Sequence, residues 1–222
     1  MTRESSAVRP EEVRSKILTS AKELFVQQGY KKTTIRQIVN RSGILTGSIY
    51  YFYKNKAEIF QALVLSLLDK CIHLITENFH DASPAFQYAA MCAVELKAVT
   101  WNNLVRECYY EGYTSNMIFQ KMTEELSAVS EHMFRGCGQS FNHEDYYLRT
   151  LLIKGAMRSY VAELYFNRTI SPDKYQELLL REVLFIFGFH KEQVEQVLQE
   201  IKEKDDVLSD IAEQLIRLSI EQ

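Results

Sequence analysis

The chain has 222 residues, of which 46% are hydrophobic, 12% aromatic and 25% charged, and it contains only 8 Gly and 3 Pro. These fractions are typical of a soluble globular protein and exclude a disordered, collagen-like or turn-rich all-β chain. The formal net charge of -3 is unevenly divided. Residues 1–70 hold 12 Lys and Arg against 6 Asp and Glu, a balance of +6, whereas the remainder holds 14 against 23, a balance of -9. We therefore expect the N-terminal part to contact a polyanion.

Motifs for catalysis, metal binding or export are not apparent. The four cysteines form no CxxC pair and no Cys/His group with the spacing of zinc ligands. No nucleophile motif or Gly-rich phosphate loop is visible, so we expect no enzyme activity, no cofactor and no metal. The N-terminus lacks the apolar core of a secretory signal, and the longest apolar run, residues 62–68, is shorter than the ~20 residues that span a bilayer. A cytoplasmic protein without membrane contact is expected.

Four helices are predicted near the N-terminus, at residues 13–28, 34–42, 46–53 and 56–80. Gly29 ends the first helix, Thr34 and Gln37 fit a capping box at the start of the second, and Gly43 breaks the second. Asn55 is placed to cap the fourth helix. A short helix, a tight turn with Gly and another short helix form a helix-turn-helix arrangement, whose second helix can enter a DNA major groove. A plain three-helix bundle has the same pattern.

The residues around this turn favour the first interpretation. The stretches TTIRQIVNRSGI at 33–44 and GSIYYFYKNK at 47–56, with AKELF at 21–25 and QGY at 28–30, resemble the DNA-binding domain of the TetR family of transcriptional regulators. The resemblance covers about residues 11–65. It implies an all-α chain with a helix-turn-helix domain at 1–55, a connecting helix at 56–80 and a larger helical domain for effector binding and dimerisation at 81–222. It also implies a homodimer that binds a near-palindromic operator in double-stranded DNA and is a repressor released by an unknown small-molecule effector.

The resemblance places the DNA contacts at the starts of the second, third and fourth helices, on Thr33, Thr34, Arg36, Thr46, Gly47, Ser48, Tyr50, Tyr51 and Lys56. Hydroxyls and free amides at a helix start can hold a phosphate, and small residues let a helix approach the base edges. Core packing of Tyr50 and simple capping by Thr34 are the competing roles. Two positions depart from the family pattern: Leu45 cannot cap, so the third helix is expected to begin at Thr46, and Phe52 replaces a polar contact.

The segment from Pro84 to Glu111 shows a helical stripe that mixes apolar, aromatic and polar side chains. A ligand cavity with a few orienting polar groups has this mixture, and we expect the effector among Tyr88, Met91, Glu95, Asn102, Arg106 and Tyr109. Polar members pointing to solvent beside an ordinary core would give the same stripe.

Two helices predicted at residues 144–166 and 173–187 are the candidates for a four-helix dimer interface. The interface is expected to include Leu148, Leu152, Gly155, Ser159, Leu179, Val183 and Ile186. The small residues Gly155 and Ser159, four apart, would allow close helix approach. Burial of these faces within one subunit is the alternative. One or two further helices follow in 190–222. For the whole chain, the alternative function is a DNA-binding protein of the same fold without a small-molecule effector.

Overall fold

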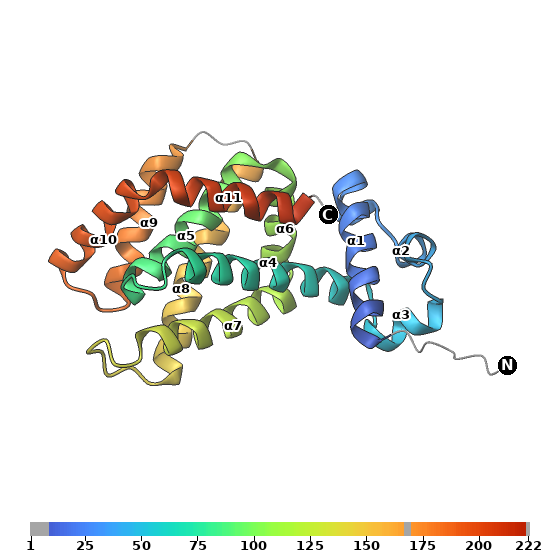
Figure 1. Ribbon diagram of the computed structural model, residues 1–222, viewed down its shortest axis with the longest axis horizontal. Helices are drawn as coiled ribbons and strands as arrows, with labels where there is room; N and C mark the ends of the chain where they lie inside the picture. The colour runs from blue at the N-terminus through green and yellow to red at the C-terminus, as the bar shows by residue number, and fades with distance from the viewer. Residues whose placement is uncertain (1–8, 167–169, 221–222) are drawn as a thin grey trace.

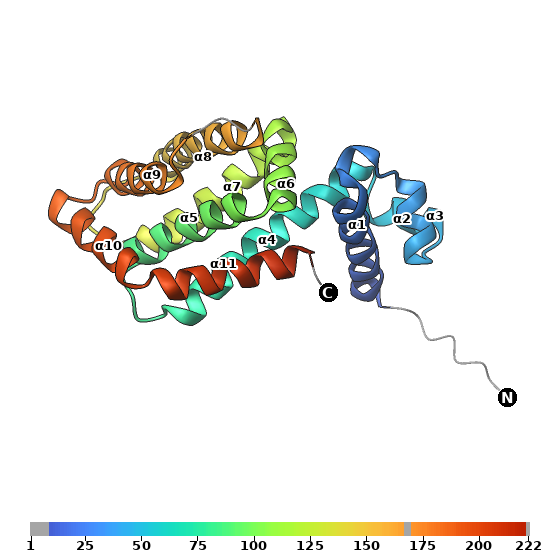
Figure 2. The same cartoon turned by 90° about the horizontal axis from the view of Figure 1, so that it is seen from above.

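The computed structural model describes residues 9–166 and 170–220, and within these ranges it contains eleven α-helices and no β-strand (Figure 1). The predicted all-α fold is confirmed. The helices are α1 (Pro10–Lys32), α2 (Ile35–Ser42), α3 (Thr46–Phe52), α4 (Lys56–Asn78), α5 (Pro84–Trp101), α6 (Asn103–Thr114), α7 (Asn116–Phe134), α8 (His143–Tyr165), α9 (Pro172–Ile186), α10 (Lys191–Glu203) and α11 (Asp205–Ile220). We call α1–α3 the head and α5–α11 the body; α4 runs from one into the other (Figures 1 and 2).

The head folds around inward-facing aliphatic residues. Ile17 of α1, Ile38 of α2 and Ile49 of α3 are completely buried. α2 begins at the predicted capping box, in which the Thr34 hydroxyl accepts from the Gln37 amide and the Gln37 side chain accepts from the Thr34 amide. These caps satisfy helix-end donors that would otherwise lack partners. The short α2 and α3, which would be marginal alone, are therefore held by tertiary packing and capping.

α4 is the longest apolar helix and joins the two parts. Among the described residues it alone is long and apolar enough to cross a membrane, a test that core helices also pass. Its apolar side, which includes Phe60, Val64 and Leu68, is buried, and it packs against α1, α5, α6 and α11. The longest apolar run, residues 62–68, underestimates the apolar length of α4 because polar residues interrupt its sequence.

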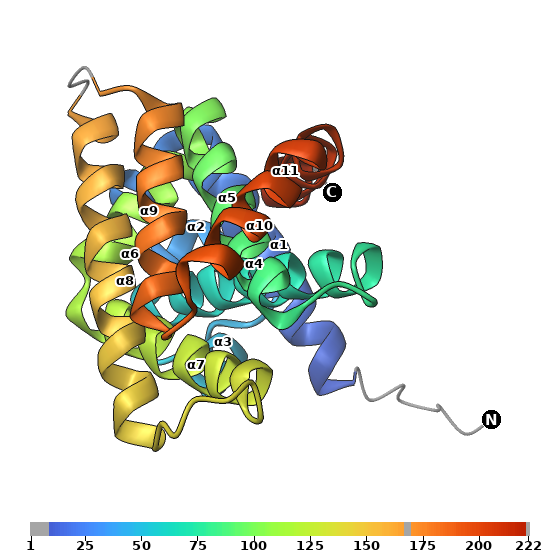
Figure 3. The same cartoon turned by 90° about the vertical axis from the view of Figure 1, so that its left-hand side faces the viewer.

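The body is built around α5, which is apolar on most of its circumference. α5 packs against α4, α6, α9, α10 and α11 and is the most central helix of the body. α7 packs on α8, and α8 and α9 lie side by side along one edge of the body (Figure 3). The segment 190–222, in which one or two helices are expected, contains α10 and α11, which are separated only at Lys204.

The predicted stripe over 84–111 is not one helix. Asn102 interrupts it in an extended conformation, and its side-chain Oδ1 accepts from the amides of Leu104 and Val105 at 2.9 and 3.0 Å. Asn favours helix N-caps because its side chain satisfies the first free amides. Helical periodicity alone missed this break, and it also missed α7, which follows after Ser115.

A buried ion pair lies in the middle of the body. Lys154 of α8 donates to both carboxylate oxygens of Glu95 of α5, at 2.8 and 3.1 Å, and the Tyr113 hydroxyl of α6 donates to Glu95 at 3.0 Å. Lys154 is 3% exposed and Glu95 is 6% exposed. Removing two charges from water costs several kcal/mol each, so the pair persists only because each group has partners. It links three helices of the body at one point.

We expect Lys154→Met to lower the free energy of unfolding by about 3–5 kcal/mol, because it leaves the Glu95 carboxylate buried without a counter-charge. The double variant Glu95→Gln, Lys154→Met should recover most of this loss. Urea unfolding followed by circular dichroism measures both. Lys121→Met, which removes a surface ion pair with Glu125, is the control and should leave the midpoint unchanged. Equal stability of the single and double variants would contradict the electrostatic explanation.

Candidate nucleic-acid interface

The turn between α2 and α3 is set by Gly43. Gly43 adopts the left-handed conformation, with φ of 66°, and its amide donates to the Val39 carbonyl at the end of α2. Residues with a Cβ rarely adopt this conformation, and glycine does so without cost. α3 begins at Thr46, as expected, and Leu45 precedes it without a side-chain cap. Ile49 and the buried Tyr53 hold α3 against the head.

The outer face of α3 is free of contacts with the rest of the head. Thr46, Gly47, Tyr50 and Tyr51 are exposed and Ser48 is half-buried. Tyr51 is 83% exposed and touches only the ring of Phe52 among the described aromatic residues. Figures 1 and 2 place α2 and α3 at the end of the molecule farthest from the body. Exposed aromatic and hydroxyl side chains on a protruding helix can reach base edges and phosphates in a groove.

The structure divides the predicted residues of α2 and its preceding turn into two groups. Arg36 is exposed, and Thr34 is exposed while capping α2. Thr33, by contrast, is 1% exposed, and its hydroxyl donates to the carbonyls of Gly29 at 2.9 Å and Leu24 at 3.3 Å. The expectation that the Thr33 hydroxyl faces DNA is corrected: it ties the end of α1 to the turn that leads into α2.

Lys56 also points inward. Its Nζ donates to the carbonyls of Tyr30 at 2.7 Å and Thr33 at 2.8 Å, and it lies 4.1 Å from the centroid of the Tyr30 ring. Burial lowers the pKa of the Lys56 ammonium group, and the nearby Glu111 carboxylate acts in the opposite direction. Two of its three N–H groups are therefore used within the chain. Lys56 joins the first turn of α4 to the end of α1, and we assign it first to positioning the head.

Leu45 and Phe52 are the two positions that depart from the family pattern. Leu45 is 79% exposed at the tip of the turn. Phe52 is half-buried and packs under the guanidinium of Arg14, 5.5 Å from the ring centroid. The head also carries the exposed cations Lys32, Arg36 and Lys54. Arg41 is engaged by Glu23 and Gln27 of α1. A surface with this excess of positive charge attracts the phosphate backbone.

The predicted effector residues do not form one site. Tyr88, Met91, Glu95 and Tyr109 line an interior cavity of about 10 Å³, which holds roughly one water molecule. Asn102 caps α6, and the Arg106 guanidinium donates to the carbonyls of Val99 and Thr100 at the end of α5. These last two side chains are therefore used at the junction of α5 and α6. The sequence pattern placed all six residues on one helix, whereas the break at Asn102 divides them between α5 and α6.

The predicted interface residues also divide into two groups. Leu148, Leu152 and Ser159 of α8 are exposed, and a Cβ added at Gly155 would meet no atom within 4 Å. On α9, however, Leu179 and Val183 are buried within the chain, since this side of the helix packs against α5 and α10. Ile186 is half-buried. The apolar stripe that was predicted to form the interface on α9 is the side of the helix that faces the core of the same chain.

The exposed large apolar residues of α9 are Leu178 and Phe185, and neither is among the interface residues predicted from the sequence. Their signal was present in the sequence: each lies outside the helical stripe that contains Leu179 and Val183. Leu148 and Leu152 are exposed on α8, which lies beside α9 (Figure 3), and we refer to these four residues as the apolar surface of α8 and α9. Exposed apolar residues that are grouped mark interaction sites more often than scattered ones do.

Comparison with known proteins identifies the head. The family profile described as bacterial regulatory proteins, tetR family, matches residues 17–63. The HTH-type transcriptional regulator TtgR of Pseudomonas putida is 38% identical over 64 residues, which is 29% of this chain and 30% of that protein. The HTH-type transcriptional repressor BepR of Brucella suis is 32% identical over 130 residues, or 53% of this chain and 62% of BepR. The sequence matches thus cover less than two thirds of these relatives.

The fold comparison extends over the body. The crystal structure of RolR in complex with resorcinol aligns with 85% of this chain and 94% of its own, with a TM-score of 0.64 and 14% identity. A TetR-family regulator from Syntrophomonas wolfei aligns with 82% of this chain and 99% of its own, with a TM-score of 0.57 and 19% identity. At these identities the likeness concerns the fold alone. The head therefore matches the DNA-binding domain of the TetR family of transcriptional regulators in sequence, and the chain as a whole shares its fold with solved structures that include a TetR-family regulator.

Proposed function

We propose that this chain is a cytoplasmic, homodimeric repressor that binds a near-palindromic operator in double-stranded DNA and is released by a small-molecule effector. The observation that supports this most directly is the outer face of α3, where Thr46, Gly47, Tyr50 and Tyr51 are exposed on a helix anchored from behind by Ile49. The proposed domains are those expected from the sequence: the head at 1–55, the connecting helix at 56–80 and the body at 81–222.

The apolar surface on α8 and α9 supports a dimer. Two copies related by a twofold axis would bury Leu148, Leu152, Leu178 and Phe185, and the open space at Gly155 permits close approach of the helices. The two α3 helices of such a dimer would have to enter successive major grooves, ~34–36 Å apart or somewhat farther. A near-palindromic site follows from the symmetry.

Ligand release is supported by the fold shared with RolR, whose structure contains resorcinol. The alternative is a DNA-binding protein of the same fold that responds to no effector. A mobility-shift assay on the DNA upstream of its own gene tests operator binding, and selection from a random DNA pool identifies the site if that segment is not bound. The absence of any sequence-selective complex at low salt, with folded dimer present, would reject the proposal.

Arg36→Ala should weaken binding to operator and to unrelated DNA by similar factors, because an exposed cation on α2 contacts phosphate and reads no base. The slope of log K against log salt concentration should become shallower by about one. Fluorescence anisotropy over a salt series measures both. Arg135→Ala, an exposed arginine of the body paired with Glu131, is the matched control and should leave the slope unchanged.

Tyr51→Ala should reduce operator affinity by about 1–3 kcal/mol and lower the ratio of specific to non-specific binding. The side chain is exposed and supports no packing of the core, so the thermal midpoint should stay unchanged. Trp101→Ala, another exposed aromatic residue on α5, is the control. If Tyr51→Ala binds operator and unrelated DNA as the wild type does, Tyr51 does not read the site.

Leu152→Glu should convert the dimer into a monomer, because it places a charge in the centre of the apolar surface on α8. Light scattering coupled to size-exclusion chromatography measures the mass. Val207→Glu introduces the same charge at an exposed apolar position of α11, on another side of the body, and should remain dimeric. A dimeric Leu152→Glu would place the interface elsewhere.

A further inference from the structure

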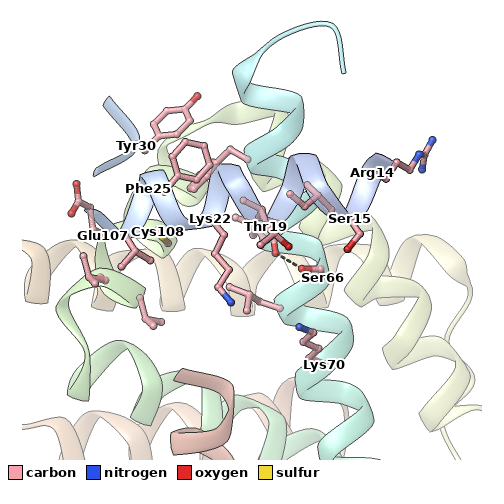
Figure 4. A pocket seen from close by; sticks show the side chains of 18 of the residues that line it. Arg14, Ser15, Thr19, Lys22, Phe25, Tyr30, Ser66, Lys70, Glu107 and Cys108 are labelled. Carbon is pink, nitrogen blue, oxygen red and sulfur yellow. Dashed lines mark hydrogen bonds between the residues drawn. The ribbon is translucent and has the colours of Figure 1, made fainter. Parts of the chain in front are cut away.

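A pocket of about 440 Å³ lies between the head and the body, away from the outer face of α3. α1, α4 and α6 form its walls, and Figure 4 shows side chains from all three reaching into it. Its apolar lining includes Leu18, Phe25, Leu63, Leu67, Leu104 and Val105. Small-molecule sites are typically concave, largely apolar and ~300–1,000 Å³ in volume. This pocket meets those criteria. The interior cavity lined by the predicted effector residues Tyr88, Met91, Glu95 and Tyr109 has a volume of only about 10 Å³ and does not.

The charged side chains that line the pocket are three cations, Arg14, Lys22 and Lys70, and two carboxylates, Glu11 and Glu107. Lys22 of α1 and Lys70 of α4 line the same side and reach into the pocket, whereas Glu107 lies at the far end beside Tyr30 (Figure 4). Within the part of the chain that the structure describes, Lys70 forms no hydrogen bond or ion pair. An apolar chamber with two ammonium groups at one side fits a ligand that has an apolar body and a negatively charged end.

One wall of the pocket is the aromatic cluster that positions the head. The rings of Phe25, Tyr30 and Phe60 contact one another, with centroids 4.5–5.6 Å apart, and all three line the pocket. The Lys56 ammonium lies over the Tyr30 ring and binds the carbonyls of Tyr30 and Thr33. A ligand that contacts these rings therefore contacts the group that fixes the turn into α2.

The opposite wall of the pocket, α6, contacts the C-terminal end of α1, where Tyr30 lies. Lys31 forms an ion pair of 2.9 Å with Glu111 of α6. Gly29 interrupts α1 with φ of +80°, and a Cβ at this position would lie 3.0 Å from the Glu107 carboxylate. The head and α6 are thus in close contact at the edge of the pocket. A ligand bound between the head and α6 contacts both, so its affinity depends on the orientation of the head relative to the body.

From this geometry we infer that the pocket between α1, α4 and α6 binds an amphipathic organic anion. Its apolar body lies against Phe25, Leu63 and Leu67, its negative end lies between Lys22 and Lys70, and its occupancy changes the affinity of the head for operator DNA. This inference rests on the proposed function, since it identifies the site and the chemical class of the effector. By linkage, operator binding changes the ligand affinity by the same factor.

The first test is calorimetric titration of the full-length dimer with dodecanoate, dodecanol and dodecylammonium, which share the apolar chain and differ in the charge of the end group. Dodecanoate should bind once per subunit, about five- to tenfold more tightly than dodecanol, and dodecylammonium should bind most weakly. Lys70→Met should reduce dodecanoate affinity about two- to fivefold and leave dodecanol affinity unchanged. Lys202→Met, an exposed lysine of α10, is the matched control.

The second test fills the pocket. Thr19→Trp places a large side chain at a half-buried lining position of α1 and should abolish binding of all three compounds. Dodecanoate should change the operator affinity of the wild type and have no effect on that of Thr19→Trp, as measured by fluorescence anisotropy. Lys70→Met does not touch the core, so it serves as the test if Thr19→Trp does not fold.

Equal affinities for the three compounds, or unchanged dodecanoate affinity in both variants, would overturn the site. Dodecanoate binding that leaves operator affinity unchanged would overturn the coupling. Neither result concerns the proposed DNA binding, which is measured without ligand. Conversely, a wild type that binds no operator overturns the proposed function, while the calorimetric series still reports on the pocket.

Discussion

The position of α2 and α3 relative to the body depends on the contacts of one ammonium group, that of Lys56. Lys56, in the first turn of α4, donates to two carbonyls at the end of α1 and lies over the Tyr30 ring. These carbonyls belong to the turn that leads from α1 into α2, so the interaction fixes the start of the helix-turn-helix relative to the helix that enters the body. Partial desolvation strengthens such charge-assisted hydrogen bonds, and the cost appears as a lowered pKa of Lys56. The apolar contacts between α4 and the head, such as that of Phe60 with Phe25, are non-directional and cannot fix this geometry alone.

Much of the fold could be predicted from local signals. The capping box at Thr34, the glycine at position 43 and the start of α3 at Thr46 all follow from the chemistry of helix ends, which involves neighbouring residues only. The break at Asn102 involves the same chemistry, yet periodicity conceals it because the apolar spacing continues on both sides of the break. A stripe identifies a helical segment without showing that the helix is continuous.

The site residues were less predictable because their roles depend on tertiary contacts. Thr33 and Lys56 have polar side chains suited to phosphate binding, and the sequence offers no sign that Gly29, Leu24 and Tyr30 supply carbonyls for them. On α9 the sequence indicated an apolar stripe correctly, but an apolar stripe faces the subunit's own core before it faces a partner. The residues that remain outward, Leu178 and Phe185, are recognisable only after the inward face has been assigned.

The distribution of polar groups in the body bears on where a ligand can enter. The Glu95–Lys154 pair and Tyr113 fill the centre of the body and satisfy one another, so opening that region would expose charges that lose their partners. Neither Glu95 nor Lys154 lines the pocket at the head, so a ligand can bind there without breaking the buried pair. The junction of head and body is also where a displacement of Tyr30 reaches Lys56 directly, because the Lys56 ammonium lies over the Tyr30 ring and donates to its carbonyl, so a ligand bound in this pocket is well placed to reorient the head.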